Sequence, residues 1–237
     1  MRPIKGYLLR RTWIRTKPAE DLKIVEESPC ARNPGRGTVH RGDVLALLNK
    51  YASSDASWYT HCLHVSGTAH RLAELISQRG HPVDIEQAAA LGLLHDLGRS
   101  RGHSLRHGIE GYLLARAEGH EEEGRICLIH ILKGRTLEEG VQLGMLTQQE
   151  LQELRRQNRR YDRPSFEEKI VCVADALLSD TGLVSIEEKY ANARRRYGAL
   201  PHHYEDEAWI QGIATELAEL LGKTPYEALA EESNDLL

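Results

Sequence analysis

Two aspartates lie in stretches of sequence that should be buried. Asp175 belongs to the segment EEKIVCVADALLSD, in which most of its neighbours at helical spacing are apolar. Asp96 follows His95 at the end of the apolar run AAALGLLHDLG. A lone buried carboxylate is costly unless it is paired, protonated or bound to a metal ion. The sequence therefore demands a partner for each of these carboxylates.

Two histidines are embedded in apolar sequence in the same manner. His61 opens the segment HCLHVSGTAHRLAELI, where apolar residues continue its stripe at helical spacing, and His130 stands in ICLIHILKG. A single histidine of this kind is more often a hydrogen-bonded core residue than a ligand. Four such polar positions in one helical region favour a different explanation, because imidazole and carboxylate groups together suit a divalent transition metal.

The elements that must position these side chains are helices. From residue 42 onward apolar residues recur with helical spacing, and almost nothing alternates with the period of two that strands show. Asp84 is a predicted N-cap, and Ser165 with Glu168 forms a predicted capping box. Helical pattern begins at residue 43, and further helices are predicted at about 55–80, 85–97, 107–118, 121–133, 147–157, 165–179, 185–197 and 206–221. The fold class is therefore all-α, with His202 and His203 in a linker before the last predicted helix.

A different kind of sequence precedes the helices. Residues 1–41 combine four prolines and several glycines with short apolar stretches, which is typical of an irregular or hairpin-like arm. We predict no chemistry there, although the arm could form an oligomer contact or a lid. The remaining residues, 42–237, are predicted to form one domain.

Composition excludes several classes of protein. The 237 residues are 41% hydrophobic and 28% charged, as in ordinary globular domains. A formal net charge of -4 leaves no basic excess for non-specific nucleic-acid binding. No apolar run approaches the roughly 20 residues of a membrane span, and no secretory signal is evident, so we expect a cytoplasmic protein. The four cysteines form no CxxC pair, and we expect them to be reduced.

The ordered set of histidines and aspartates resembles the HD-domain superfamily of metal-dependent phosphohydrolases, and within it the HDIG subgroup. HCLHVSGTAHRLA is similar to the family's first ligand helix, LGLLHDLGR to its HDxGK/R element, and EEKIVCVADALL to its final ligand helix. SIEEKYANARRRYG is similar to the helix that follows in the HDIG subgroup. The resemblance covers about residues 45–222, and it implies a helical bundle around a metal site.

Further histidines extend the resemblance to members that hold two ions. RHGIEG contains His107 with Gly111 one turn on, like the HxxxG element of dinuclear members, and His130 matches the ligand on the succeeding helix. The implied cofactor is a pair of divalent ions of iron, manganese, cobalt or nickel, with Asp96 bridging them and a hydroxide that they activate. The implied ligands are His61, His95, Asp96, His107, His130 and Asp175.

Basic residues near these ligands suggest an anionic substrate. Arg99 stands where the family more often has lysine, and Lys133 stands where the HDIG subgroup often has a glycine motif. We predict that Arg99, Arg101 and Lys133 bind the substrate phosphate, and that Asp96, Arg99 and His103 are catalytic. His103 would protonate the leaving group, whereas Arg101 could equally be a solvent-facing cation.

The implied activity is hydrolysis of a small phosphate ester, either a nucleotide or a phosphorylated metabolite. The same fold and ligands also fit a mixed-valent di-iron oxygenase similar to myo-inositol oxygenase, and only the basic residues favour hydrolysis over it. A nucleotide-binding regulatory module is a third interpretation, but it predicts lost ligands and none is missing. The expected partner is a small phosphorylated molecule rather than a membrane or nucleic acid, and a homo-oligomer remains open.

Overall fold

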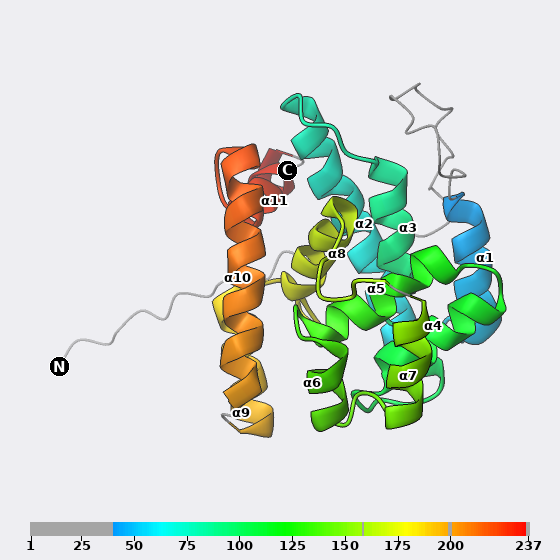
Figure 1. Ribbon diagram of the computed structural model, residues 1–237. Coiled ribbons are helices and arrows are strands. Elements are labelled where there is room, and N and C mark those ends of the chain that lie inside the picture. The colour runs from blue at the N-terminus through cyan, green and yellow to red at the C-terminus, as the bar shows by residue number, and fades with distance from the viewer. Residues whose placement is uncertain (1–39, 158, 199–200, 236–237) are drawn as a thin grey trace.

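The structure is a computed structural model that describes residues 40–157, 159–198 and 201–235. The described residues form an all-α bundle with one very short hairpin (Figure 1). The elements are α1 (Arg41–Tyr51), α2 (Ser57–Gln78), α3 (Ile85–Leu94), the 3-10 helix η2 (Leu97–Ser100), α4 (His107–Ala117), α5 (Glu121–Leu132), α6 (Leu137–Gln142), α7 (Gln148–Arg156), α8 (Phe166–Ala176), β1 (Leu178–Ser179), β2 (Gly182–Leu183), α9 (Ile186–Tyr197), α10 (Pro201–Leu221) and α11 (Pro225–Asp235). The predicted all-α class is confirmed.

The core lies where α2, α3 and α8 pack against one another. The apolar residues of α2 that face it recur every three or four positions and are buried, as in Val65, Ala69, Leu72 and Ile76, so α2 is amphipathic. By contrast, α3 is buried on all sides from Ala88 to Leu94, because it lies between α2, α8 and α1. A central helix of this kind delivers its C-terminal residues into the interior.

A second helix pair completes the interior. The helix α4 packs against α5 and η2, and α5 also contacts α3 and α8. The predicted N-cap of α3 and capping box of α8 are both present: the Asp84 side chain accepts from Gln87 N–H, and the Ser165 hydroxyl accepts from Glu168 N–H. Cys62, Cys127 and Cys172 are buried free thiols.

Several elements differ from the prediction. The helix α8 ends at Ala176 rather than near 179, because the chain reverses through β1 and β2, which pair Leu178 with Leu183. Strands of two residues are too short to show an alternating pattern. The sequence pattern also does not predict α6 and α11. The prediction of a linker at His202 and His203 is wrong, because α10 begins at Pro201 and contains both; proline is a favourable first residue of a helix.

Most of the predicted N-terminal arm lies outside the described residues. This part comprises residues 1–39 and includes Cys30. Arg41, the last residue of the predicted arm, already begins α1.

Glycines allow the segments around the end of α3 to approach closely. A Cβ atom on Gly92 would lie 2.7 Å from Ser66 Cα in α2, and one on Gly111 would lie 2.8 Å from the backbone nitrogen of Gly98. Real Cβ atoms do not approach neighbours this closely. At Gly92, α3 therefore lies closer to α2 than a larger residue would permit. At Gly111, α4 lies closer to η2 for the same reason.

Replacing Gly98 by alanine should destabilise the protein strongly. A Cβ atom at Gly98 would lie 1.9 Å from the backbone oxygen of His107 and 2.5 Å from the backbone nitrogen of Gly111, and backbone atoms cannot turn aside. We expect Gly98→Ala to lower the free energy of unfolding by about 3 kcal/mol, at the upper end of overpacking. Urea unfolding measures the change.

Gly67→Ala is the matched control. Gly67 lies inside α2, and a Cβ atom added there would meet nothing within 4 Å, so alanine should raise stability by up to about 1 kcal/mol. Unchanged stability of Gly98→Ala would contradict the close approach of η2 and α4.

Candidate metal centre

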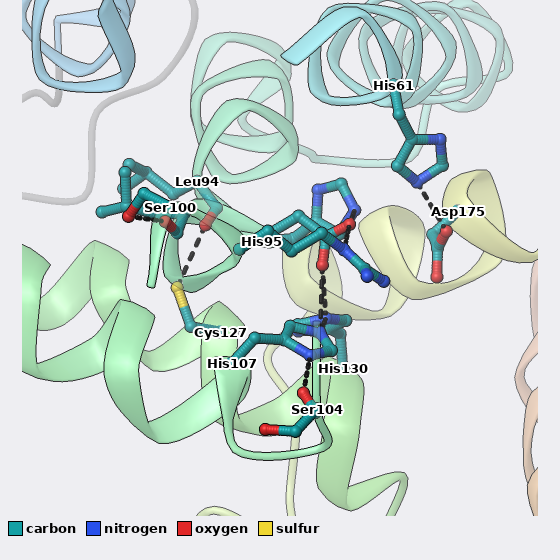
Figure 2. Close-up of polar contacts among 12 residues, drawn as sticks. His61, Leu94, His95, Ser100, Ser104, His107, Cys127, His130 and Asp175 are labelled. Atoms are coloured by element: carbon teal, nitrogen blue, oxygen red, sulfur yellow. Dashed lines mark hydrogen bonds and ion pairs between the residues drawn. The ribbon is translucent and has the colours of Figure 1, made fainter. Parts of the chain in front are cut away.

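Six side chains from five parts of the bundle converge in the interior (Figure 2). His61 comes from α2, His95 is the C-cap of α3 and Asp96 follows it. His107 is the first residue of α4, while His130 and Asp175 lie near the C-terminal ends of α5 and α8. They form two groups, each with ligand atoms within 4.8 Å of one another: the first ligand group is His61, His95 and Asp175, and the second ligand group is Asp96, His107 and His130.

The first ligand group is partly open to solvent. His61 Nε2 lies 3.1 Å from Asp175 Oδ1, and the two side chains are 27% and 22% exposed. The rings of His61 and His95 meet edge to face with their centroids 5.2 Å apart. His95 is buried, so the group extends from the surface inward.

The second ligand group lies deeper. Asp96 Oδ1 is 3.1 Å from His107 Nε2 and 3.3 Å from His130 Nε2, and all three side chains are at most 5% exposed. The other carboxylate oxygen of Asp96, Oδ2, lies 3.6 Å from His95 Nε2. Asp96 therefore contacts histidines of both groups, which is the arrangement that a bridging carboxylate requires.

Main-chain carbonyl groups determine which ring nitrogen of three histidines carries its proton. The Nδ1–H groups of His95, His107 and His130 donate to the carbonyl oxygens of Gly92, Ser104 and Ile126, at 2.8, 2.6 and 3.0 Å. A carbonyl oxygen can only accept, so each Nδ1 carries the hydrogen. In the neutral ring the Nε2 atom is then left with a lone pair, as in metal-ligating histidines.

This arrangement needs a cation. His107 Nε2 and His130 Nε2 lie 3.3 Å apart, and Asp96 Oδ1 faces both, so three acceptor atoms converge in a dry interior. Neither His95 Nε2 nor Asp96 Oδ1 has a hydrogen-bond partner although both are buried. Such groups are costly to bury unpaired. Divalent metal ions therefore fit the residues that are present.

The local electrostatics keep the ligands in their binding forms. Burial lowers the pKa of His95 to about 4 and also lowers the pKa of His130. Burial raises the pKa of Asp96, but the neighbouring histidines outweigh it and hold that pKa well below its usual range. Exclusion of water likewise raises the pKa of Asp175, and Lys189 and His61 lower it more. The His95 and His130 imidazoles are neutral and the carboxylates ionised at neutral pH.

The predicted basic residues lie at different distances from the ligands. Arg99 Nε donates to Asp96 Oδ2 at 2.5 Å while its side chain is 30% exposed. Arg101 is exposed and lines an open hollow of about 190 Å³ beside His107. His103 is exposed, and within the described ranges it makes no hydrogen bond or ion pair with a ligand.

Lys133 has an unusual backbone conformation. It caps the C-terminus of α5 with φ 49° and ψ 53°, and it is the one non-glycine residue with positive φ in the described part of the chain. Its ammonium lies 3.4 Å from Asp206 Oδ2 and 5.5 Å from the centre of the Tyr190 ring. Burial lowers the pKa of Lys133, but Tyr190 and nearby carboxylates raise it above its ordinary value, so the cation persists.

One residue at the centre was missed by the sequence analysis. Lys189 donates from Nζ to the backbone oxygen of Asp175 at 2.5 Å and to Asp175 Oδ1 at 3.1 Å. It lies in the first turns of α9, in the segment SIEEKY, whose polar composition gave no sign of a buried target. Four histidines outside the centre, which we expected at the surface because they match no ligand of the family signature, are half-buried, namely His64, His70, His81 and His120.

Comparison with known proteins is consistent with this geometry. Residues 58–180 match the family model of the HD domain, so the chain belongs to the HD-domain family, whose members are generally metal-dependent hydrolases. An uncharacterized protein of Methanocaldococcus jannaschii is 38% identical over 157 residues, covering 65% of this chain and 84% of that protein. No solved structure matches the chain. None of the helices in the described ranges combines the length and apolar character of a membrane span.

Two further relatives are longer. Proteins named tRNA (cytidine(56)-2'-O)-methyltransferase from Picrophilus torridus and Thermoplasma volcanium are each 28% identical, over 162 and 155 residues. These alignments cover 67% and 64% of this chain but only 43% and 40% of the methyltransferases. The chain thus spans less than half the length of either.

The metal-free protein should lose stability on acidification because of His95. Its pKa is about 4 in the folded protein against 6.5 as a reference value, so between these values the unfolded chain binds the proton more readily. His95 therefore contributes full stability above about pH 6.5 and progressively less as the pH falls toward 4, a loss of about 3 kcal/mol in all. Urea unfolding in the presence of chelator at several pH values measures this.

His95→Gln provides the comparison for this titration. The variant has no imidazole at that position, so its stability should fall less steeply between pH 6.5 and 4.5. The low pKa values of Asp96 and Asp175 affect stability only below this window. Parallel pH profiles for wild type and variant would contradict the assignment.

Proposed function

We propose that the protein is a metal-dependent phosphohydrolase that cleaves a small phosphate ester, either a nucleotide or a phosphorylated metabolite. The observation that carries this proposal is the convergence of two ligand groups on Asp96, with cationic side chains beside them. Two ions of iron, manganese, cobalt or nickel held by these groups would polarise a phosphoryl oxygen and acidify a water molecule. Membership of the HD-domain family supports the same class of reaction.

Arg99 has two tasks in this proposal. Its Nε–H group donates to Asp96 Oδ2 and so fixes the orientation of the carboxylate that the two groups share. Because the side chain is 30% exposed, the rest of the guanidinium is available to a phosphate oxygen. A charge-assisted hydrogen bond of this kind is strong and directional, and it would offset negative charge that develops during hydrolysis.

Lys133 supplies a second positive charge. Asp206 and Tyr190 hold its ammonium, and its own position in the chain is three residues beyond the ligand His130. We assign Arg101 to the outer part of the phosphate site, since it lines the hollow beside His107. His103, in the same exposed loop, is the proposed proton donor to the leaving group, which requires it to approach bound substrate.

The two other functions are weaker. A mixed-valent di-iron oxygenase could use the same six ligands, but a cation that contacts the shared carboxylate suits an anionic phosphate ester better than an uncharged substrate. A regulatory module that binds a nucleotide without hydrolysis predicts missing ligands, whereas all six lie together. The methyl transfer to tRNA in the names of two relatives is not carried over, because the chain spans less than half of their length.

Asp96→Asn tests the proposed reaction. The amide keeps the size of the side chain but removes the charge that both ligand groups share, so phosphate release from a panel of phosphoesters should fall about 100-fold or more. Phosphate release and oxygen uptake are measured in parallel, with Asp43→Asn on the exposed face of α1 as the matched control. Oxygen uptake by the iron-loaded protein without phosphate release would refute the proposal.

Lys133→Gly separates the function of this lysine from its cost to the fold. Glycine adopts positive φ freely, whereas other residues in this conformation lose about 1–2 kcal/mol. The variant should therefore keep or slightly raise the thermal unfolding temperature, while KM for the phosphate ester rises about tenfold. An unchanged KM together with lower stability would mean that Lys133 serves only the fold.

A further inference from the structure

We propose that Lys189 is a positioning residue, which holds the metal ligand Asp175 ready to coordinate. This inference rests on the proposed metal centre but not on the reaction that the centre performs. The family match ends at residue 180, so Lys189 lies outside the segment that the HD-domain family assigns. A ligand of the first ligand group is then held in place from a helix beyond that domain.

The ammonium of Lys189 binds one residue twice. Its Nζ atom donates to the backbone oxygen of Asp175 at 2.5 Å and to Oδ1 of the same residue at 3.1 Å. These two contacts fix the side-chain torsion of Asp175, because one anchor is on the main chain and the other is on the carboxylate. Oδ1 also lies 3.1 Å from His61 Nε2, so Lys189 directs the carboxylate toward another ligand of its group.

The end of α8 makes this position suitable for a cation. The helix ends at Ala176, so the carbonyl oxygen of Asp175 is among the last four, which lack a partner within the helix. The partial negative charge at a helix C-terminus also favours a nearby lysine. Lys189 thus satisfies the helix end and the ligand side chain with one group.

Other ligands are held in a comparable way. Main-chain carbonyls hold His95, His107 and His130 through Nδ1, and Arg99 holds Asp96. Lys189 is the corresponding contact for Asp175. Outer-shell partners of this kind orient ligands, and their loss typically weakens metal binding about 10–100-fold.

A short reversal of the chain brings Lys189 to this place. The strands β1 and β2 turn the chain directly after α8, and the Ser185 side chain then caps α9 by accepting from Glu188 N–H. Lys189 is the next residue, and Tyr190 after it is buried beside Lys133. Two successive residues of α9 therefore reach the carboxylate ligand and the proposed phosphate-binding lysine.

Two opposing effects decide what Lys189 does to metal affinity. Its charge repels a divalent ion, whereas its hydrogen bonds keep the Asp175 carboxylate in place. The contact with the backbone oxygen keeps the ammonium anchored even when Oδ1 turns to an ion. We therefore expect orientation to outweigh repulsion, which gives the experiment a definite sign.

The test is a titration of the full chain with Mn²⁺ after removal of metal by chelator. Calorimetry should give two ions bound to wild type, and Lys189→Met should weaken one of them about 10–100-fold and leave the other unchanged. Lys189→Arg, which keeps a cationic donor, should recover most of the lost affinity. Lys169→Met is the matched control, because Lys169 lies on α8 itself and pairs with Glu216 at the exposed surface.

A double variant tests whether Lys189 acts through Asp175. In the background of Asp175→Asn, the change Lys189→Met should cause no further loss of Mn²⁺ affinity, because the carboxylate that it positions is already gone. An additional loss in that background would overturn the proposal. So would wild-type or tighter Mn²⁺ binding by Lys189→Met, since repulsion would then dominate.

Two further variants separate failure of this inference from failure of the metal centre. His61→Ala and His107→Ala should each weaken the binding of one ion, in the first and second ligand groups respectively. If neither changes Mn²⁺ binding, the proposed centre itself is wrong; if both do and Lys189→Met does not, only the role of Lys189 is wrong. Should Lys189→Met fail to fold by circular dichroism, Lys189→Gln carries the same expectation and the same refuting outcome.

Discussion

The convergence of acceptor atoms in a dry interior is the constraint on which the structure depends. Asp96 Oδ1 faces the Nε2 atoms of His107 and His130 at 3.1 and 3.3 Å, and neither ring in its neutral form can donate from Nε2, because its one proton is on the Nδ1 atom that binds a carbonyl oxygen. Burial strengthens their mutual repulsion. A bound metal cation resolves this arrangement and leaves the hydrogen bonds around it intact.

The folding of the chain around Asp96 follows from that constraint. The helix α3 ends at Leu94; His95 still has helical torsion angles and enters the first ligand group, whereas Asp96 departs from them and enters the second. The chain then has to return at once as η2 and α4 to deliver His107. Gly98 and Gly111 make this return possible because their backbones touch, and Cys127 packs against the same junction while its thiol donates to Leu94 O at 3.0 Å.

The sequence predicted residues of the metal centre where a polar side chain stands among apolar neighbours. Apolar neighbours predict burial, and hence a shared partner, for His61, His95, Asp96, His130 and Asp175. The division into two ligand groups was not predictable, because it depends on packing between helices. Lys189 was not predicted for the opposite reason: it stands among charged residues, where a lysine is normally solvated. Leu177 and Leu178 continue the apolar pattern of α8, so the sequence does not show where that helix ends and the hairpin begins, in which Gly182 takes φ 110°.

The two ligand groups differ in exposure to solvent, and different parts of the chain surround them. The second ligand group is closed in by α4 and α5, whereas His61 and Asp175 meet solvent, so solvent reaches the centre through the first group. Lys189 contacts Asp175 of that group, and Tyr190 beside it packs against Lys133; Lys189 and Tyr190 both lie on α9, beyond the family match. The matched domain thus provides all six candidate ligands, and the added helix contributes to the surroundings of the more accessible group. Substrate selectivity depends on the groups that line the approach to a centre, and the ligand set therefore defines the class of chemistry more closely than it defines the substrate.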